Sequence, residues 1–410
     1  MNLIGSAWVH RPPAEWSVRL LLAVLAVWLG YQAIVHSFAQ VLQGAQIDRA
    51  FALAPDDARI AGRMSKRLWS ANATSAQRAL VDEIARRALQ LDATTVEAVA
   101  TLGTNAALMG RSEQSRRLFT YSQRLSRREL RTQIWAIEDA VSRDDIPKAL
   151  HHYDIALRTS RDTPQLLFPV LVSAISEPDI RRELVRKLTT RPQWSEGFLD
   201  YAAVNGPHVE ETARLYMFLR RSGVPISNLA SAGVIERLIV ARKHSVAWSY
   251  YSTIRRGVDA RKSRDEDFSS GLEVPTQFDW MVVEAPGISA APQKIGNTGL
   301  FDFAAAPSAG GPVLHQLQTL PPGQYLIEGK SANIDQPPNA RPYWSLTCRG
   351  GRELGRIEMP NSATGGGVFS GRLSVPSECP VQVLSMVIRP TEALGGAVGQ
   401  IERISLRPVS

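Results

Sequence analysis

The sequence predicts a multidomain α + β protein with an N-terminal transmembrane helix, a helical solenoid and a C-terminal antiparallel β-sandwich of the jelly-roll kind. Three observations predict it: one apolar run, a 34-residue repeat, and a change to alternating apolar residues after about residue 270. A chain of 410 residues is long enough for two or three domains. We expect a cytoplasmic N-terminus at 1–19, the transmembrane helix at 20–38, the solenoid at 45–268 and the sandwich at 272–410.

The apolar run Leu20–Phe38 contains no Asp, Glu, Lys or Arg. As a helix it spans about 28 Å, close to the thickness of a bilayer core. Arg11 and Arg19 precede it, whereas no Lys or Arg follows until Arg49. The positive-inside rule therefore predicts that residues after about 39 lie outside the cytoplasm. A cleaved signal peptide and a buried core helix are the alternatives.

The helical middle of the chain repeats a small-then-large spacing every 34 residues. In one unit the three positions hold Ala149, Tyr153 and Ala156. One and two periods earlier the same positions hold Ser115, Phe119 and Ser122, and Val81, Ala85 and Ala88. A small residue lets two helices approach, and a large residue four positions on fills the gap. Such helix pairs stack on their neighbours, which predicts an extended surface for a protein partner.

Leu102 and Gly103, with Gly110 after them, occupy positions where tetratricopeptide repeats place Leu-Gly and a turn glycine. The region resembles this family, with repeats near 62–95, 96–129 and 130–163. The consensus tryptophan is absent, and Ala93 stands where proline is usual. A non-repeat α-bundle is the alternative, and the sequence leaves open whether regular repeats continue past residue 163.

Four arginines at i, i+3, i+4 and i+7 predict a basic helix face if their helix is continuous: Arg124, Arg127, Arg128 and Arg131. This face could bind an anionic polymer or lipid headgroups, and a solvated face is the alternative. The net charge is +8, but no cluster interleaves basic with aromatic residues, so we expect no nucleic acid partner. No ligand spacing predicts a metal, and we expect no cofactor.

Beyond the charged segment 261–270, interpreted as a hinge, about nine short alternating strands are separated by Pro and Gly turns. They are expected at 278–283, 300–304, 313–319, 324–330, 343–348, 353–358, 367–375, 381–388 and 400–406. Cys348 ends one of these strands and Cys379 precedes another. In an exported domain a disulfide between them would contribute about 3–4 kcal/mol, and two free thiols are the alternative.

The segment Leu320–Tyr325, the strand of Trp344 and the final strand with Ile401, Ile404 and Leu406 resemble jelly-roll modules of carbohydrate-active proteins. The whole layout resembles membrane-anchored exopolysaccharide-cluster proteins of proteobacteria. That resemblance implies a single-pass protein of the bacterial inner membrane whose periplasmic part supports the assembly or export of exopolysaccharide or envelope glycan.

Strand alternation directs Tyr343 away from Trp344, so Tyr343 is a candidate aromatic platform for a sugar. Hydrogen bonds could come from polar residues of the adjoining loop: Asn333, Asp335, Gln336 and Arg341. A core position for the tyrosine is the alternative. The sequence leaves open whether the sandwich binds a structural calcium.

No nucleophile elbow, phosphate-binding loop or zinc-protease motif occurs in the sequence. We therefore expect a non-enzymatic scaffold or binding protein, with a protein partner on the helices and a polysaccharide on the sandwich. Two alternatives stay open. One is a membrane-tethered protein-assembly factor without glycan contact. The other is a carbohydrate-active enzyme that uses sandwich carboxylates.

Overall fold

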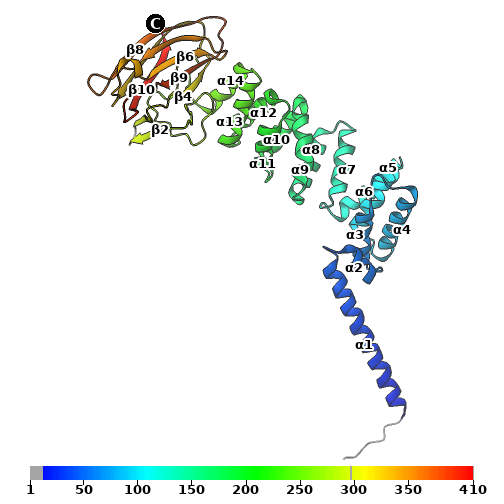
Figure 1. The fold of residues 1–410 in the computed structure, drawn as a ribbon. Helices are drawn as coiled ribbons and strands as arrows, with labels where there is room; N and C mark the ends of the chain where they lie inside the picture. The colour runs from blue at the N-terminus through cyan, green and yellow to red at the C-terminus, as the bar shows by residue number, and fades with distance from the viewer. Residues whose placement is uncertain (1–12, 296–297, 410) are drawn as a thin grey trace, which may run out of the picture. The chain divides into compact units, whose positions relative to one another are not determined.

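A computed structural model describes residues 13–295 and 298–409, in which fourteen α-helices precede ten β-strands (Figure 1). The predicted multidomain α + β class is confirmed. The chain divides into two compact units, Met1–Thr163 and Pro164–Ser410. The helices of the first unit are α1 (Pro13–Leu42), α2 (Ile47–Leu53), α3 (Ala58–Leu68), α4 (Ser75–Leu91), α5 (Val96–Leu108), α6 (Ser112–Leu125), α7 (Leu130–Val141) and α8 (Ile146–Thr159).

The second unit contains the remaining helices and all the described strands. From α9 on, the helices are α9 (Thr163–Ser173), α10 (Pro178–Thr189), α11 (Ser195–Asn205), α12 (Val209–Arg221), α13 (Asn228–Val240) and α14 (His244–Ile254). The strands are β1 (Met281–Val282), β2 (Ile288–Ile295), β3 (Thr298–Ala305), β4 (Gly311–Gln318), β5 (Gly323–Ala332), β6 (Tyr343–Cys348), β7 (Glu353–Glu358), β8 (Val368–Val375), β9 (Gln382–Ile388) and β10 (Ala397–Pro408).

The helix α1 contains the predicted apolar run. Its segment Trp16–Leu42 is long and apolar enough to cross a membrane, and a signal sequence near an N-terminus has the same properties. The most apolar part of this segment is not buried at all, which is not the environment of a core helix. Residues 1–12, including the Arg11 used in the orientation prediction, lie outside the described residues.

The helices α3 to α8 form consecutive pairs that pack through small residues. A Cβ on Gly103 in α5 would lie 3.1 Å from the ring of Phe119 in α6, so the absence of a side chain permits the close approach. Phe119 in turn stacks on Trp135 of α7 with a centroid distance of 4.9 Å. Leu102 is half-buried, and Gly110 has a φ of 72° in the turn between α5 and α6. Buried on α8 are Ala149, Tyr153 and Ala156.

The predicted basic helix face is wrong, because the helix is not continuous. The helix α6 ends at Leu125 and α7 begins at Leu130, so the four arginines fall on the end of α6, the connecting turn and α7. Their i, i+3, i+4, i+7 spacing therefore does not place them on one side. Arg131 instead donates from Nε to Glu129 at 3.2 Å and from Nη2 to the hydroxyl of Thr101 at 3.1 Å. This arginine stabilises packing within the first unit.

The sandwich consists of two five-stranded antiparallel sheets, with strand orders β1-β4-β9-β6-β7 and β2-β3-β10-β5-β8. All nine predicted strands form, the first only as the short β1. The strand β2 was missed because its sequence, ISAAPQKI, lacks clear alternation and contains Pro292. Its place at a sheet edge explains why a proline is tolerated there.

Apolar side chains from both sheets fill the space between them. Trp344 and Leu346 of β6 are fully buried, as are Ile327 of β5 and Ile404 of β10. Trp280 lies 5.6 Å from Trp344 between ring centroids. The two tryptophans are therefore core residues, and the alternate residues of β6 point outward.

The charged segment 261–270 is not a hinge, because it is built into the sandwich. The backbone N–H of Ser263 donates to the carbonyl of Leu406 at 2.9 Å, so the segment lies alongside the last strand, β10. Phe268 is buried against Trp280 and Phe301, with ring centroids 5.7 and 5.8 Å away. Burial of this single aromatic residue outweighs the polar composition around it.

Arg264 in the same segment attaches α14 to the sandwich. Its buried guanidinium donates to the carbonyl of Phe278 at 2.8 and 3.0 Å, to the side-chain oxygen of Gln318 at 2.7 Å, and to the carbonyl of Leu317. It also lies 5.4 Å from the ring centroid of Trp248 in α14. Burial lowers the pKa of Arg264 to about 10, so the side chain remains charged at neutral pH.

Candidate functional site

The outward face of the sheet β1-β4-β9-β6-β7 carries a row of polar side chains. Ser345 of β6 lies directly opposite Ser385 of β9 on one side and Arg356 of β7 on the other. Ser385 in turn lies opposite His315 of β4. The inward neighbours of these residues belong to the core, so the row crosses four strands on the outward face of the sheet. Ser345 is buried within this row, whereas His315 and Ser385 are half-buried and Arg356 is exposed.

Tyr343 lies on this face at the start of β6, within a cluster that we name the Tyr343 cluster. The guanidinium carbons of Arg356 and Arg389 each lie 4.8 Å from its ring centroid. Arg356 makes two bonds of 2.8 Å to Glu353, and Arg389 makes one of 2.7 Å to Glu358. The ring is half-buried and covered by arginines, so the expected bare aromatic platform is instead a cluster of charged planar groups.

The charges of the Tyr343 cluster are paired with one another. Hydrogen bonds from Arg356 lower the pKa of Glu353, and the same contacts raise the pKa of the arginine. Glu353 is therefore ionised at neutral pH and accepts hydrogen bonds. Paired guanidinium and carboxylate groups can bind neighbouring hydroxyl groups from both sides, because one group donates where the other accepts.

The polar loop residues predicted to bind a sugar do not all contact the same part of the sandwich. Asn333 donates to Gln400 of β10 at 3.2 Å, and Gln336 is buried and donates to the carbonyl of Gly396 at 3.0 Å. These two side chains therefore support the loop rather than the Tyr343 cluster. Asp335 is exposed and accepts from Asn361, just beyond β7, at 2.9 Å.

The loop between β5 and β6 also borders the Tyr343 cluster. Arg389 donates to the carbonyl of Pro338 in this loop at 3.5 Å. Arg341 donates to the carbonyl of Gln336 at 3.4 Å and is half-buried, so it braces the loop. Asp335 is thus the one predicted loop residue that combines exposure with a contact to the segment after β7.

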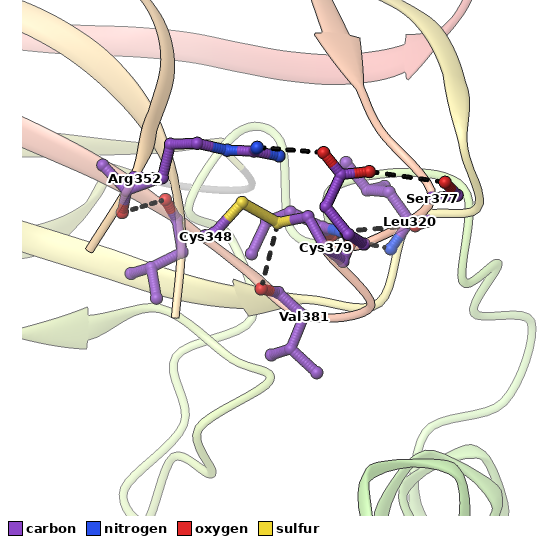
Figure 2. Close-up of a disulfide and its surroundings, with 10 residues drawn as sticks. Leu320, Cys348, Arg352, Ser377, Cys379 and Val381 are labelled. Carbon is purple, nitrogen blue, oxygen red and sulfur yellow. Dashed lines mark hydrogen bonds and ion pairs between the residues drawn. A yellow bond between two sulfur atoms is a disulfide. The ribbon is translucent and has the colours of Figure 1, made fainter. Parts of the chain in front are cut away.

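The two cysteines form the predicted disulfide, which joins the end of β6 to the loop before β9 (Figure 2). Beneath it, the buried Gln382 side chain accepts from the N–H of Leu320 at 2.9 Å and donates to the carbonyl of Cys379. Arg352 and Glu378 pair at 2.9 Å across the same two loops (Figure 2). Covalent, polar and ionic contacts therefore fix this end of the sandwich.

A cleft of about 730 Å³ lies beside the disulfide, between α13, the start of α14 and the sandwich loops. Its polar lining includes Arg242 from the turn after α13, His244 from the start of α14, and Arg349, Arg352 and Glu378 from the sandwich. We name it the disulfide cleft. Sequence reasoning did not find it, because its two walls come from segments more than 100 residues apart.

Metal-ligating side chains do not gather in the part of the chain that the structure describes. Within those residues, no group of three or more His, Cys, Asp or Glu side chains is arranged to hold a metal ion. His151 and His152 contact each other edge to face, and the buried His152 ring forms a 2.9 Å hydrogen bond with Gln133. Burial lowers the pKa of His152, which favours the neutral ring in this packing role.

Part of the chain is similar to solved structures that include carbohydrate-binding modules, at TM-scores below 0.5. No family model matches the sequence, and no curated protein matches it. The tetratricopeptide resemblance and the exopolysaccharide setting therefore stay predictions.

Three of the solved structures that are similar to part of this chain are compared with it by identity, coverage and TM-score. A family 4 carbohydrate-binding module is 13% identical over 36% of this chain and 97% of its own, with a TM-score of 0.26. A family 61 module in complex with β-1,4-galactotriose is 13% identical over 38% and 99%, with a TM-score of 0.25. A Clostridium thermocellum xylanase 10B fragment with a family 22 module, complexed with xylohexaose, is 10% identical over 36% and 29%, with a TM-score of 0.26. Likeness at such identities concerns the fold alone, so any binding site must be argued from this chain's own residues.

Proposed function

We propose that this protein is a non-enzymatic, membrane-anchored binding protein whose sandwich binds a glycan at the Tyr343 cluster. The setting is the periplasm of a bacterium, where the protein supports assembly or export of an exopolysaccharide or envelope glycan. The helices hold a protein partner, and α1 anchors the chain in the inner membrane.

The observation that carries the proposal is the composition of the Tyr343 cluster. Exposed Arg356 and half-buried Arg389, each paired with an exposed glutamate, bring donors and acceptors together around one aromatic ring, which is the chemistry that recognises neighbouring sugar hydroxyls. Ser345, the next outward residue of β6, is buried and its neighbour Ser385 is half-buried, so the charged groups of the cluster supply its accessible polar atoms. Glu353 is held ionised by Arg356, which favours recognition over proton donation.

Two features support a location outside the cytoplasm. The disulfide Cys348–Cys379 belongs to an oxidising compartment. The apolar segment Trp16–Leu42 gives the chain either an anchor or an export signal. Both are compatible with a periplasmic sandwich tethered through α1.

The scaffold role is supported by the regular spacing of the central helices. The helices α5 and α7 begin at residues 96 and 130, and α6 and α8 begin at 112 and 146, so both members of the pair repeat after 34 residues. Stacked pairs with this period bury their faces only against neighbours and leave an extended surface. We propose that this tetratricopeptide-like stack is the site for the protein partner.

The test is glycan binding by the full chain in detergent, measured by titration calorimetry against a panel of bacterial polysaccharides. Arg389→Ala should weaken binding of the recognised glycan by about 10-fold or more, because a charged donor is lost. Tyr343→Ala should act in the same direction, since both arginines lie on its ring. Arg372→Ala on β8 is the matched control, because this exposed arginine belongs to the opposite sheet.

Three results would contradict the proposal. Equal affinities for Arg389→Ala and the wild type would remove the Tyr343 cluster from the binding site. Absence of any glycan ligand, together with a protein that co-purifies through the helices, would favour an assembly factor. Turnover of a polysaccharide, abolished by one carboxylate substitution, would instead show an enzyme.

A further inference from the structure

The disulfide cleft carries an excess of positive charge that the described residues do not neutralise. Arg242 follows α13 and Arg349 follows β6, and no described carboxylate forms an ion pair with either. Their positive charges both act on His244 between them. The nearby Lys243 and Arg352 differ, because they pair with Glu210 and Glu378 at 2.6 and 2.9 Å.

The free hydrogen-bonding capacity in the cleft belongs mainly to donors. Arg349 makes one long contact of 3.5 Å from Nη1 to the carbonyl of Ile239, which leaves its other guanidinium N–H groups available. The Nδ1 of His244 is buried and has no hydrogen-bond partner within the described chain. An anion that accepts several hydrogen bonds at once would satisfy the guanidinium groups, and the His244 Nδ1 would donate to it in the tautomer that carries the proton on this nitrogen.

Apart from Glu378, which is paired with Arg352, the remaining lining is mainly apolar. Ile239 and Val240 from α13 face Pro380 and Val381 from the sandwich, and Val240 is 68% exposed. A bare inorganic anion would leave these surfaces in contact with water. A ring with one apolar face and a carboxylate would use both kinds of lining, and a volume of about 730 Å³ is within the range of small-ligand sites.

We propose that the disulfide cleft binds an acidic sugar residue, with its carboxylate on Arg349 and Arg242 and its ring against the apolar lining. The choice of a sugar rests on the glycan-binding role proposed above, whereas the choice of an acidic one rests on the unpaired arginines. The cleft is therefore a second binding site, separate from the Tyr343 cluster and selective for negatively charged ligands. The Cys348–Cys379 bond holds the sandwich wall of the cleft in place.

The experiment titrates the full chain in detergent with oligogalacturonate, a neutral galacto-oligosaccharide of the same length, and inorganic phosphate. The wild type should bind oligogalacturonate more tightly than either of the other two probes. Arg349→Ala and Arg242→Ala should each weaken that binding by about 10-fold, whereas Arg349→Lys should retain part of it. Arg372→Ala is the control for charge loss elsewhere on the sandwich.

The outcomes separate this inference from the proposed function. Loss of oligogalacturonate binding in Arg349→Ala, with binding kept in Arg389→Ala, supports the disulfide cleft as the binding site. Oligogalacturonate affinity that is unchanged in both cleft variants overturns it, even if a neutral glycan still binds at the Tyr343 cluster. Phosphate that binds as tightly as oligogalacturonate overturns the assignment to a sugar. Thermal midpoints within about 2 °C of the wild type show that the variants are folded.

Discussion

Replacing Arg264 with alanine should loosen the attachment of α14 to the sandwich. The substitution deprives several buried acceptors of their donor, among them the carbonyls of Phe278 and Leu317 and the side chain of Gln318. Each unsatisfied acceptor costs about 1–3 kcal/mol, while relief of the buried charge returns part of that cost. We expect the free energy of unfolding of the second unit to fall by about 3 kcal/mol.

For a unit of this size that loss corresponds to a fall in the thermal midpoint of about 6–12 °C. Tryptophan fluorescence of the full chain reports the change, because Trp248 lies directly against the guanidinium. The control is Arg261→Ala, since Asp259 is the one ion-pair partner of this surface arginine among the described residues, and it should shift the midpoint by less than about 2 °C. Equal thermal midpoints for the two variants would refute the role of Arg264 in attaching α14 to the sandwich.

Three further predictions concern other parts of the chain. The double variant Cys348→Ser/Cys379→Ser should lower the free energy of unfolding by about 3–4 kcal/mol, because the disulfide joins residues 31 positions apart. Adding a reductant to the wild type should have the same effect, and an unchanged thermal midpoint would contradict the prediction. Gly103→Leu should cost about 1–3 kcal/mol in the first unit, because even a Cβ there would lie 3.1 Å from an aromatic ring, whereas Gly233→Leu, in open space, should not destabilise. Burial and two arginines lower the pKa of His244, so its contribution to stability is present above about pH 6.5 and is lost as pH falls through the lowered pKa. The thermal midpoint of His244→Gln should therefore fall less between pH 7 and 5 than that of the wild type. An identical dependence of the midpoint on pH in both proteins would refute this prediction.

Local patterns predicted the helical and strand regions well. The apolar run became α1, and alternation located nine of the ten described strands, because both patterns record how one segment is buried along its own length. The disulfide followed from strand ends that hold Cys348 and Cys379. The edge strand β2 was missed, since an edge strand needs less alternation and tolerates a proline.

The errors occurred where a single contact outweighed composition. The segment 261–270 was interpreted as a hinge because most of it is charged, yet Phe268 and Arg264 are buried in the second unit. The arginines from Arg124 to Arg131 fitted a helical period, but a turn interrupts it. Tyr343 was correctly placed on the outward face, while the arginines over its ring come from β7 and the end of β9 and left no local pattern.

The sequence by itself determined the apolar span, the order of helices and strands, and the outward direction of alternate residues in β6, because neighbours along the chain fix these properties. Only the tertiary structure decided which charges stay unpaired and where a cleft opens. Ile239 and Arg349 meet across 110 residues in the disulfide cleft, and no pattern within one segment can record that contact. Pairing and burial of polar groups depend on which segments the fold brings together.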